Sequence, residues 1–366
     1  MFVQHDVMVP MRDGVHLATD IYYPSEALPG TGQAWPVILE RTPYGKHRQS
    51  RSERDHVRTE PLSRAAVAEY FVAHGYVVVY QDGRGRHQSE GEFVKYLAEA
   101  DDGYDTCAWL QQQPWWSWYD VYPLTAVENY AGLKSAGAPV RLSLGPWTHG
   151  NRWETFSGDV DFGPAARLAG TIAPDFMRLR LDWFDHWLKG VDNGAERAPA
   201  VMLFVMGGGS GRRDAAGRLD HGGQWRAEPD WPLARAVATR FYLQEDGGLS
   251  PALPAQAEAQ RSYDFDPADP VPTLGGCVVS RSPAILAGGY DQVEHERFFG
   301  VRAIGRPLAA RADVLVFQTA PLEKDVEVTG PIEAVLSVSS DCPDTDFTVK
   351  LVDVYPPSAD YPDGTP

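Results

Sequence analysis

The stretch that decides the fold is WYDVYPLTAVENYAGLKSAGAPVRLSLGPWTHG, residues 118–150. Apolar side chains recur at helical spacing over residues 124–136, and Gly137 stands where a helix ends. Residues 140–144 alternate apolar and polar side chains and predict a β-strand, which Gly145-Pro146 ends because proline cannot donate to a sheet ladder. One helix followed directly by one strand is the repeating unit of an α/β protein.

Asp120 and His149 stand near the two ends of this stretch and have the chain order of a catalytic acid and base. His149 follows the predicted strand, and this edge of an open parallel sheet is where ligands bind. Asp120 would accept a hydrogen bond from one ring nitrogen of His149 while the other nitrogen takes a proton from a nucleophile. The alternative is that both are structural loop residues, because a lone histidine at such a place is more often hydrogen-bonded within the fold.

Composition limits the classes of partner. The chain has 366 residues, 43% of them hydrophobic, and a formal net charge of −17. This length allows two domains with a sizeable core. The negative charge argues against nucleic acid and anionic membrane as partners, because both bind basic surfaces. No run reaches membrane-spanning length and the N-terminus lacks the regions of a signal peptide, so we expect a cytoplasmic protein, and a homo-oligomer is left open.

The cysteines and histidines give no indication of a metal or cofactor. Cys107, Cys277 and Cys342 are odd in number and widely spaced, so no disulfide framework is expected. The ten histidines form no H-x-x-x-H pattern. We therefore predict neither a metal site nor a cofactor.

The first half of the chain alternates strands with helices. The predicted elements are a hairpin around Asp13-Gly14, buried strands at residues 35–40 and 76–80, and helices over residues 62–74 and up to Pro114. A loop carrying Tyr44 follows the first of the buried strands. This order indicates a parallel sheet. Another strand is due before Asp120, but residues 111–118 contain no β-branched run.

The sequence pattern changes from Pro199 onward, where alternating helices and strands give way to short strand signals. An amphipathic helix that includes Phe176 and Trp187 precedes this change. Short strand signals separated by Gly, Pro and Asp turns are typical of a β-sandwich. The predicted strands lie at residues 201–205, 239–243, 314–317, 332–338 and 347–352. We place an α/β domain at residues 1–195 and a β-sandwich at residues 196–366, which is expected to be truncated because the sequence stops directly after a strong strand.

Several short motifs occur in one order along nearly the whole chain. They include Met11-Arg12-Asp13-Gly14, Arg41-Thr42-Pro43-Tyr44, QDGRGR at residues 81–86, Trp118-Tyr119-Asp120 and Gly145-Pro146-Trp147-Thr148-His149. In this order they resemble the CocE/NonD family of cocaine esterase and X-prolyl dipeptidyl aminopeptidase-like hydrolases. The resemblance implies an α/β-hydrolase fold with a helical cap, a C-terminal jelly-roll domain, and a Ser-Asp-His triad that acts on acyl esters or amides.

The resemblance also assigns roles. Asp120 would be the acid of the triad, His149 its base, and the phenol of Tyr44 one donor of the oxyanion hole. The expected partner is a small-molecule ester or a peptide substrate. For Tyr44 the alternative is a structural residue, because a tyrosine after proline in a loop commonly packs its ring and hydrogen-bonds its hydroxyl within the fold.

The chain departs from the family at the nucleophile. The family places a strand, a Gly-x-Ser-Tyr-x-Gly elbow and the cap after the position of Gln113-Pro114-Trp115, whereas this chain continues directly to Trp118-Tyr119-Asp120. We therefore expect a curtailed α/β-hydrolase domain without elbow and cap, followed by a jelly-roll-like β-sandwich. An internal deletion or a mis-assembled gene explains both the likeness and the loss.

Three residues are candidates to replace the missing serine as nucleophile. Ser117 lies between Trp115 and Tyr119, where an elbow needs small residues. Ser210 lies in a glycine-rich loop with no helix after it, and Cys107 lies on the apolar stripe of a helix. None of the three fits a nucleophile. The sequence thus predicts a chain of hydrolase lineage with little remaining activity. The alternatives are a non-catalytic binding protein and a chain that does not fold stably.

Overall fold

The computed structural model describes residues 1–24, 35–50, 60–94, 98–111, 123–148, 152–256, 259–276, 286–362 and 364. The chain forms two compact units. The first contains Met1–Asn129, Gly150–Trp153 and Leu168–Ala198, and the second contains Tyr130–His149, Glu154–Arg167 and Pro199–Pro366. The division of the chain at residues 195 and 196 remains a prediction.

The first unit is built on a sheet of four strands in the order β1-β2-β4-β3. The strands are β1 (Phe2–Pro10), β2 (His16–Tyr23), β3 (Val37–Thr42) and β4 (Val77–Asp82). β1 and β2 form the predicted antiparallel hairpin, whose turn has Gly14 at a φ of 86°. β3 and β4 run parallel, as the predicted buried strands require. The sequence prediction for this sheet is confirmed.

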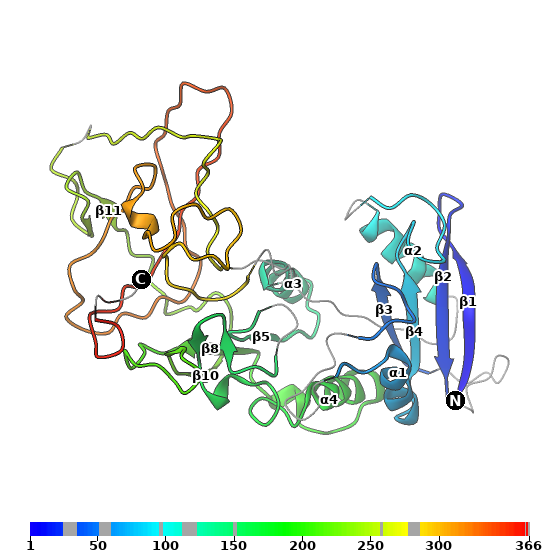
Figure 1. The fold of residues 1–366 in the computed structure, drawn as a ribbon. Coiled ribbons are helices and arrows are strands. Elements are labelled where there is room, and N and C mark those ends of the chain that lie inside the picture. Colours follow the sequence, from blue (N-terminus) through cyan, green and yellow to red (C-terminus); the bar gives the residue numbers. More distant parts are fainter. Residues whose placement is uncertain are drawn as a thin grey trace. The chain divides into compact units, whose positions relative to one another are not determined.

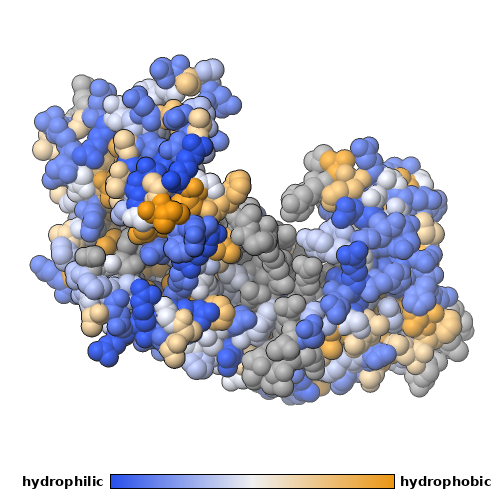
Figure 2. Space-filling model, viewed as in Figure 1, coloured by the Kyte–Doolittle hydropathy of each residue, from blue (hydrophilic) through white to orange (hydrophobic). Residues whose placement is uncertain are grey.

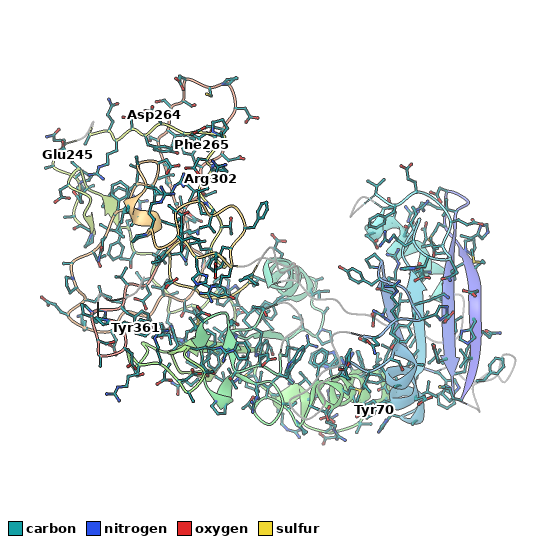
Figure 3. The ribbon with its side chains drawn as sticks, in the orientation of Figure 1. Tyr70, Glu245, Asp264, Phe265, Arg302 and Tyr361 are labelled. Carbon is teal, nitrogen blue, oxygen red and sulfur yellow. The ribbon has the colours of Figure 1, made fainter. Side chains whose placement is uncertain are left out.

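Helices cover the sheet because both of its faces are apolar (Figure 1). α1 (Arg64–Ala73) and α4 (Phe176–Lys189) pack Phe71, Leu181 and Phe184 onto one face, together with the partly buried Tyr70 of α1 (Figure 3). Ser63 caps α1 and Asp175 caps α4 through their side chains, and Gly190 ends α4 in the left-handed conformation. These caps fix the lengths of both helices.

α2 (Glu99–Gln111) lies against the opposite face of the same sheet. Thr106 of α2 donates a 2.9 Å hydrogen bond to Gln81 Oε1, and Arg41 Nη1 donates to the carbonyl of Glu99 over 2.8 Å. Side chains alternate between the faces of a strand, so Gln81 shares its face with Val77 and Val79. The described helices include none that is long and apolar enough to cross a bilayer.

The second unit holds several small sheets. A three-stranded sheet has the order β10-β8-β5, with β5 and β8 parallel. The remaining elements are α3 (Pro123–Ser135, shared with the first unit), β5 (Leu142–Leu144), β6 (Phe156–Ser157), β7 (Val160–Asp161), η1 (Pro164–Ala166), η2 (Ala195–Arg197, in the first unit), β8 (Val201–Met206), β9 (Leu219–Asp220), β10 (Gly223–Glu228), β11 (Tyr242–Leu243), β12 (Leu249–Ser250) and η3 (Leu308–Ala310). Phe162, Ala166 and Phe204 form a buried cluster here. The helix and strand expected within residues 118–150 are confirmed as α3 and β5.

The predicted strands at residues 314–317, 332–338 and 347–352 are not regular strands in the structure, and only Tyr242–Leu243 of residues 239–243 is one. Apolar residues there remain on the surface, including Val335 at 92% exposure. Figure 2 shows orange areas among blue ones on the visible face of the described residues. Alternation of side chains predicts an apolar face but supplies no partner strand for the backbone. This part of the prediction is wrong at the level of individual strands.

Candidate active site

The carboxyl ends of β3 and β4 lie side by side, because the two strands run parallel with Thr42 paired to Asp82. Tyr44 lies two residues beyond β3, on the loop that leaves this edge. In an open α/β sheet, ligands bind at the carboxyl ends of parallel strands. The structure therefore places Tyr44 at an edge of parallel strands of the kind where ligands bind.

The loop that carries Tyr44 is held by the chain that follows β4. Gly83 N–H donates to the carbonyl of Thr42 over 2.9 Å, and Arg86 Nε donates to the carbonyl of Pro43 over 3.1 Å. Lys46 N–H donates to Asp82 Oδ1 over 2.8 Å, and Asp82 is fully buried. Three hydrogen bonds on both sides of Tyr44 thus fix its backbone relative to the sheet.

The side chain of Tyr44 points to solvent. The residue is 66% exposed. Its backbone N–H donates a 3.1 Å hydrogen bond to Thr42 Oγ1. A ring packed into the core, which was the structural alternative for this residue, would be buried. The exposure leaves the phenol accessible to a ligand at this edge, and its role as an oxyanion donor remains a prediction.

Asp120 and His149 lie outside the described residues. The strand that leads to His149 is β5, which belongs to the second unit, whereas Tyr44 belongs to the first. Trp147, between β5 and His149, donates its indole N–H to the carbonyl of Ala166 over 2.7 Å and packs against Trp225 with ring centroids 5.5 Å apart. Trp147 therefore anchors the chain just before His149.

The substitutes for the nucleophile gain no support. Ser117 lies outside the described residues, and Cys107 lies in α2, as predicted, with its side chain outside the described part. Ser210 Oγ donates to Asp220 Oδ2 over 2.8 Å in the loop after β8. This hydroxyl is held by a carboxylate in a surface turn, whereas an activated serine donates to a base that takes its proton.

The QDGRGR motif, which begins with the last two residues of β4, takes part in a structural network. Arg84 Nε donates to Asp102 Oδ2 over 3.0 Å, and Arg84 Nη1 donates to Asp13 Oδ2 over 2.8 Å. Hydrogen bonds from Arg84 lower the pKa of the Asp13 carboxyl below its ordinary value. Arg84 thereby ties the hairpin turn to α2.

One cluster of side chains that can bind a metal ion is not visible in the sequence. Within the described residues, ligand atoms of His5, Asp20 and His47 lie within 4.8 Å of one another. These residues come from β1, β2 and the loop after β3, so no local spacing pattern contains them. The prediction of no metal site rested on local patterns alone.

Two segments of the chain match known protein families. Residues 13–117 match the X-Pro dipeptidyl-peptidase (S15 family), and residues 193–366 match the X-Pro dipeptidyl-peptidase C-terminal non-catalytic domain. Each match covers less than half of the chain, and in these two segments the chain resembles the X-Pro dipeptidyl-peptidase (S15) family. The expected resemblance to CocE/NonD hydrolases is confirmed, as is the order of an α/β-hydrolase-like domain and a C-terminal domain. Members of this S15 family are hydrolases.

Individual relatives and solved structures are similar to this chain to different extents. Cocaine esterase of Rhodococcus sp. (strain MB1 Bresler) is 27% identical over an alignment of 510 positions, which covers 97% of this chain and 80% of the esterase. An aminopeptidase from a marine sediment archaeon, Thaumarchaeota archaeon, has a TM-score of 0.50 at 20% identity, over 88% of this chain and 72% of that one. A CocE/NonD family hydrolase of Staphylococcus aureus has a TM-score of 0.42 at 18% identity, over 68% and 60% of the two chains.

Proposed function

We propose that this chain derives from a serine hydrolase of acyl esters or X-Pro amides and has lost the nucleophile, so that it has little or no hydrolytic turnover. Asp120 would be the acid, His149 the base and Tyr44 an oxyanion donor. The observation that carries the proposal is the break in the sequence: the S15 match stops at residue 117, and Trp118-Tyr119-Asp120 follows at once.

The alignment with cocaine esterase supports the same interpretation. It runs over 510 positions, whereas this chain has 366 residues in all. The esterase therefore contributes residues inside the alignment for which this chain has no counterpart. A segment with a nucleophile elbow and a cap would account for such a difference, and the position of the break at residue 117 fits that segment.

The chemistry explains why the loss matters. In a Ser-His-Asp triad the histidine takes the proton of the serine, and the aspartate holds the histidine in the correct tautomer. An oxyanion donor such as Tyr44 stabilises charge only after a nucleophile has attacked the carbonyl. Without the serine, the remaining groups contribute binding and electrostatic stabilisation but form no acyl-enzyme.

A fluorophosphonate probe and an ester substrate test the proposal together. We expect no covalent labelling of the purified chain and no hydrolysis of p-nitrophenyl acetate above the buffer rate. Inserting a strand and Gly-x-Ser-x-Gly segment of a relative between Trp115 and Trp118 should restore both signals. His149→Ala in that restored chain should abolish them. Labelling of the chain as given would show that another residue serves as nucleophile.

A second function is favoured by one observation. Nearly half of the chain, residues 193–366, matches a domain described as non-catalytic. A binding protein whose C-terminal domain carries the remaining function would bind a small ester or a peptide without turnover. Equilibrium dialysis with a labelled X-Pro dipeptide tests this second function: binding with full recovery of intact peptide supports it, and absence of binding contradicts it.

A further inference from the structure

Asp20 lies at the centre of a cluster of titratable side chains in the first unit. It is fully buried on β2, and each of its carboxylate oxygens faces a different set of groups. Oδ2 lies 2.9 Å from Nδ1 of His5 and 3.2 Å from Nδ1 of His47. Two imidazole nitrogens therefore converge on one carboxylate oxygen.

The fold builds this convergence with a β-bulge. The pairing of β1 with β2 shifts between Gln4 and Val7, so that His5 and Asp6 together face the single residue Asp20. Asp6 adopts the left-handed conformation, with a φ of 53°. In a regular strand His5 and Asp6 would point to opposite faces of the sheet, so the bulge is what brings both to Asp20.

The separations suit a tetrahedral metal site. Zinc binds nitrogen and carboxylate oxygen at about 2.0–2.2 Å, which places neighbouring ligand atoms about 3.3 Å apart in a tetrahedron. Here the two imidazole nitrogens lie 2.9 and 3.2 Å from the carboxylate oxygen and within 4.8 Å of each other, so the rings must move by about 1.5 Å at most to reach this geometry. The side chains of His5 and His47 are 57% and 49% exposed, which leaves a path for the ion and a position for water.

The other oxygen of Asp20 is fixed by partners that do not compete for the ion. Oδ1 accepts a hydrogen bond from Asp6 N–H at 3.0 Å and contacts Lys46 Nζ at 3.0 Å. A ligating carboxylate is commonly oriented by such hydrogen bonds to its second oxygen. Asp6 and Asp20 carry two negative charges against the single positive charge of Lys46, so the cluster favours a cation.

A metal ion would replace the hydrogen bond between Nδ1 of His5 and Oδ2 of Asp20, and it would also change one contact of Lys46. Its Nζ lies 2.8 Å from Nε2 of His47 and 2.6 Å from Oδ1 of Asp6. A metal on Nδ1 of His47 leaves the ring proton on Nε2, so the ammonium must give up this contact with His47. Its contacts with Asp6 and Asp20 remain.

We propose that His5, Asp20 and His47 form a binding site for a divalent transition metal ion. Two imidazole nitrogens and one carboxylate oxygen are a donor set for zinc, cobalt or nickel, whereas magnesium and calcium take oxygen ligands. Nothing in this site depends on the triad residues, so the site does not rest on the proposed hydrolase lineage.

Titration of the tag-free, metal-stripped full chain with Zn²⁺ and Co²⁺ tests the site. Calorimetry should give one saturable Zn²⁺ site, and bound Co²⁺ should show visible absorption without the charge-transfer band of a thiolate. His5→Gln and His47→Gln should each weaken binding more than about tenfold, whereas His74→Gln, a change at an exposed histidine of α1's C-terminal end, should leave it unchanged.

Thermal unfolding of the same proteins separates a lost ligand from a lost fold. Zn²⁺ should raise the Tm of the unchanged chain and of His74→Gln, but not of His5→Gln or His47→Gln. Both changed histidines are half-exposed, so these variants should unfold cooperatively without metal. Absence of saturable binding, binding unchanged in both variants, or a thiolate band with Co²⁺ would each overturn the proposal.

Discussion

Lys46 and Asp20 form an ion pair in which both side chains are fully buried, with Nζ 3.0 Å from Oδ1. Asp20 lies on β2, and Lys46 lies two residues after Tyr44 on the loop that leaves β3. The pair therefore fastens the candidate oxyanion loop to the antiparallel part of the sheet. Burying two charges is unfavourable unless each keeps its partner, so the pair should be sensitive to the loss of either side chain.

Lys46→Met tests that sensitivity. The change leaves the buried carboxylate of Asp20 without its ammonium partner, and we expect the free energy of unfolding to fall by about 3–5 kcal/mol. Lys134→Met removes a lysine from a half-exposed pair with Asp230 and should cost less than about 1 kcal/mol. Urea denaturation followed by circular dichroism measures both changes, and equal losses in the two variants would contradict the importance of burial.

Acid should destabilise the second unit through Glu228. Hydrogen bonds from Arg235, and further ones from Arg226, lower the pKa of this carboxyl to about 2 from a value of 4.5. Because the folded-state pKa lies below the unfolded one, the stabilisation is complete above about pH 4.5 and is lost as the pH falls towards 2.

Glu228→Gln should therefore flatten the fall in stability between pH 4.5 and 2. The measurement is the midpoint of urea unfolding at a series of pH values. Glu333→Gln, at an exposed glutamate of the same unit, should leave the slope of the unchanged chain intact. A slope unaffected by Glu228→Gln would show that other carboxyls govern the acid transition.

Local chemistry in the sequence accounts for much of the first unit. Asp13-Gly14 supplies the positive φ of the hairpin turn, and Gly190 marks the end of α4 by the same property. β3 and β4 are apolar runs, which favour burial on both faces, as in a parallel sheet. In these places the residue type alone restricts the backbone, so sequence reasoning succeeds.

The rest depends on partners that are distant along the chain. Residues 332–338 alternate as a strand does, but alternation does not tell whether another backbone is available to pair with. The bulge that turns both His5 and Asp6 towards Asp20 has no marker in the sequence, because neither is a glycine. Tyr44 was found only through the order of the family's motifs, and its exposure at the sheet edge came from the structure.

Tyr44 gives the sharpest test of the proposed lineage. In a chain with the Gly-x-Ser-x-Gly segment restored, Tyr44→Phe removes only a hydroxyl from a ring that is 66% exposed. The free energy of unfolding should change by less than about 0.5 kcal/mol. If the phenol donates to the oxyanion, kcat for an ester should fall by about 10²–10³, with a smaller effect on KM, because the bond is made mainly in the transition state.

Tyr104→Phe is the matched control for that measurement. Tyr104 is 68% exposed and lies on α2. The guanidinium carbon of Arg12 lies 5.2 Å from the centroid of its ring, a contact that phenylalanine keeps. This variant should retain the kcat of the restored chain. If Tyr44→Phe also retains it, the exposed phenol at the end of β3 is a surface residue, and the oxyanion donors of this lineage lie elsewhere.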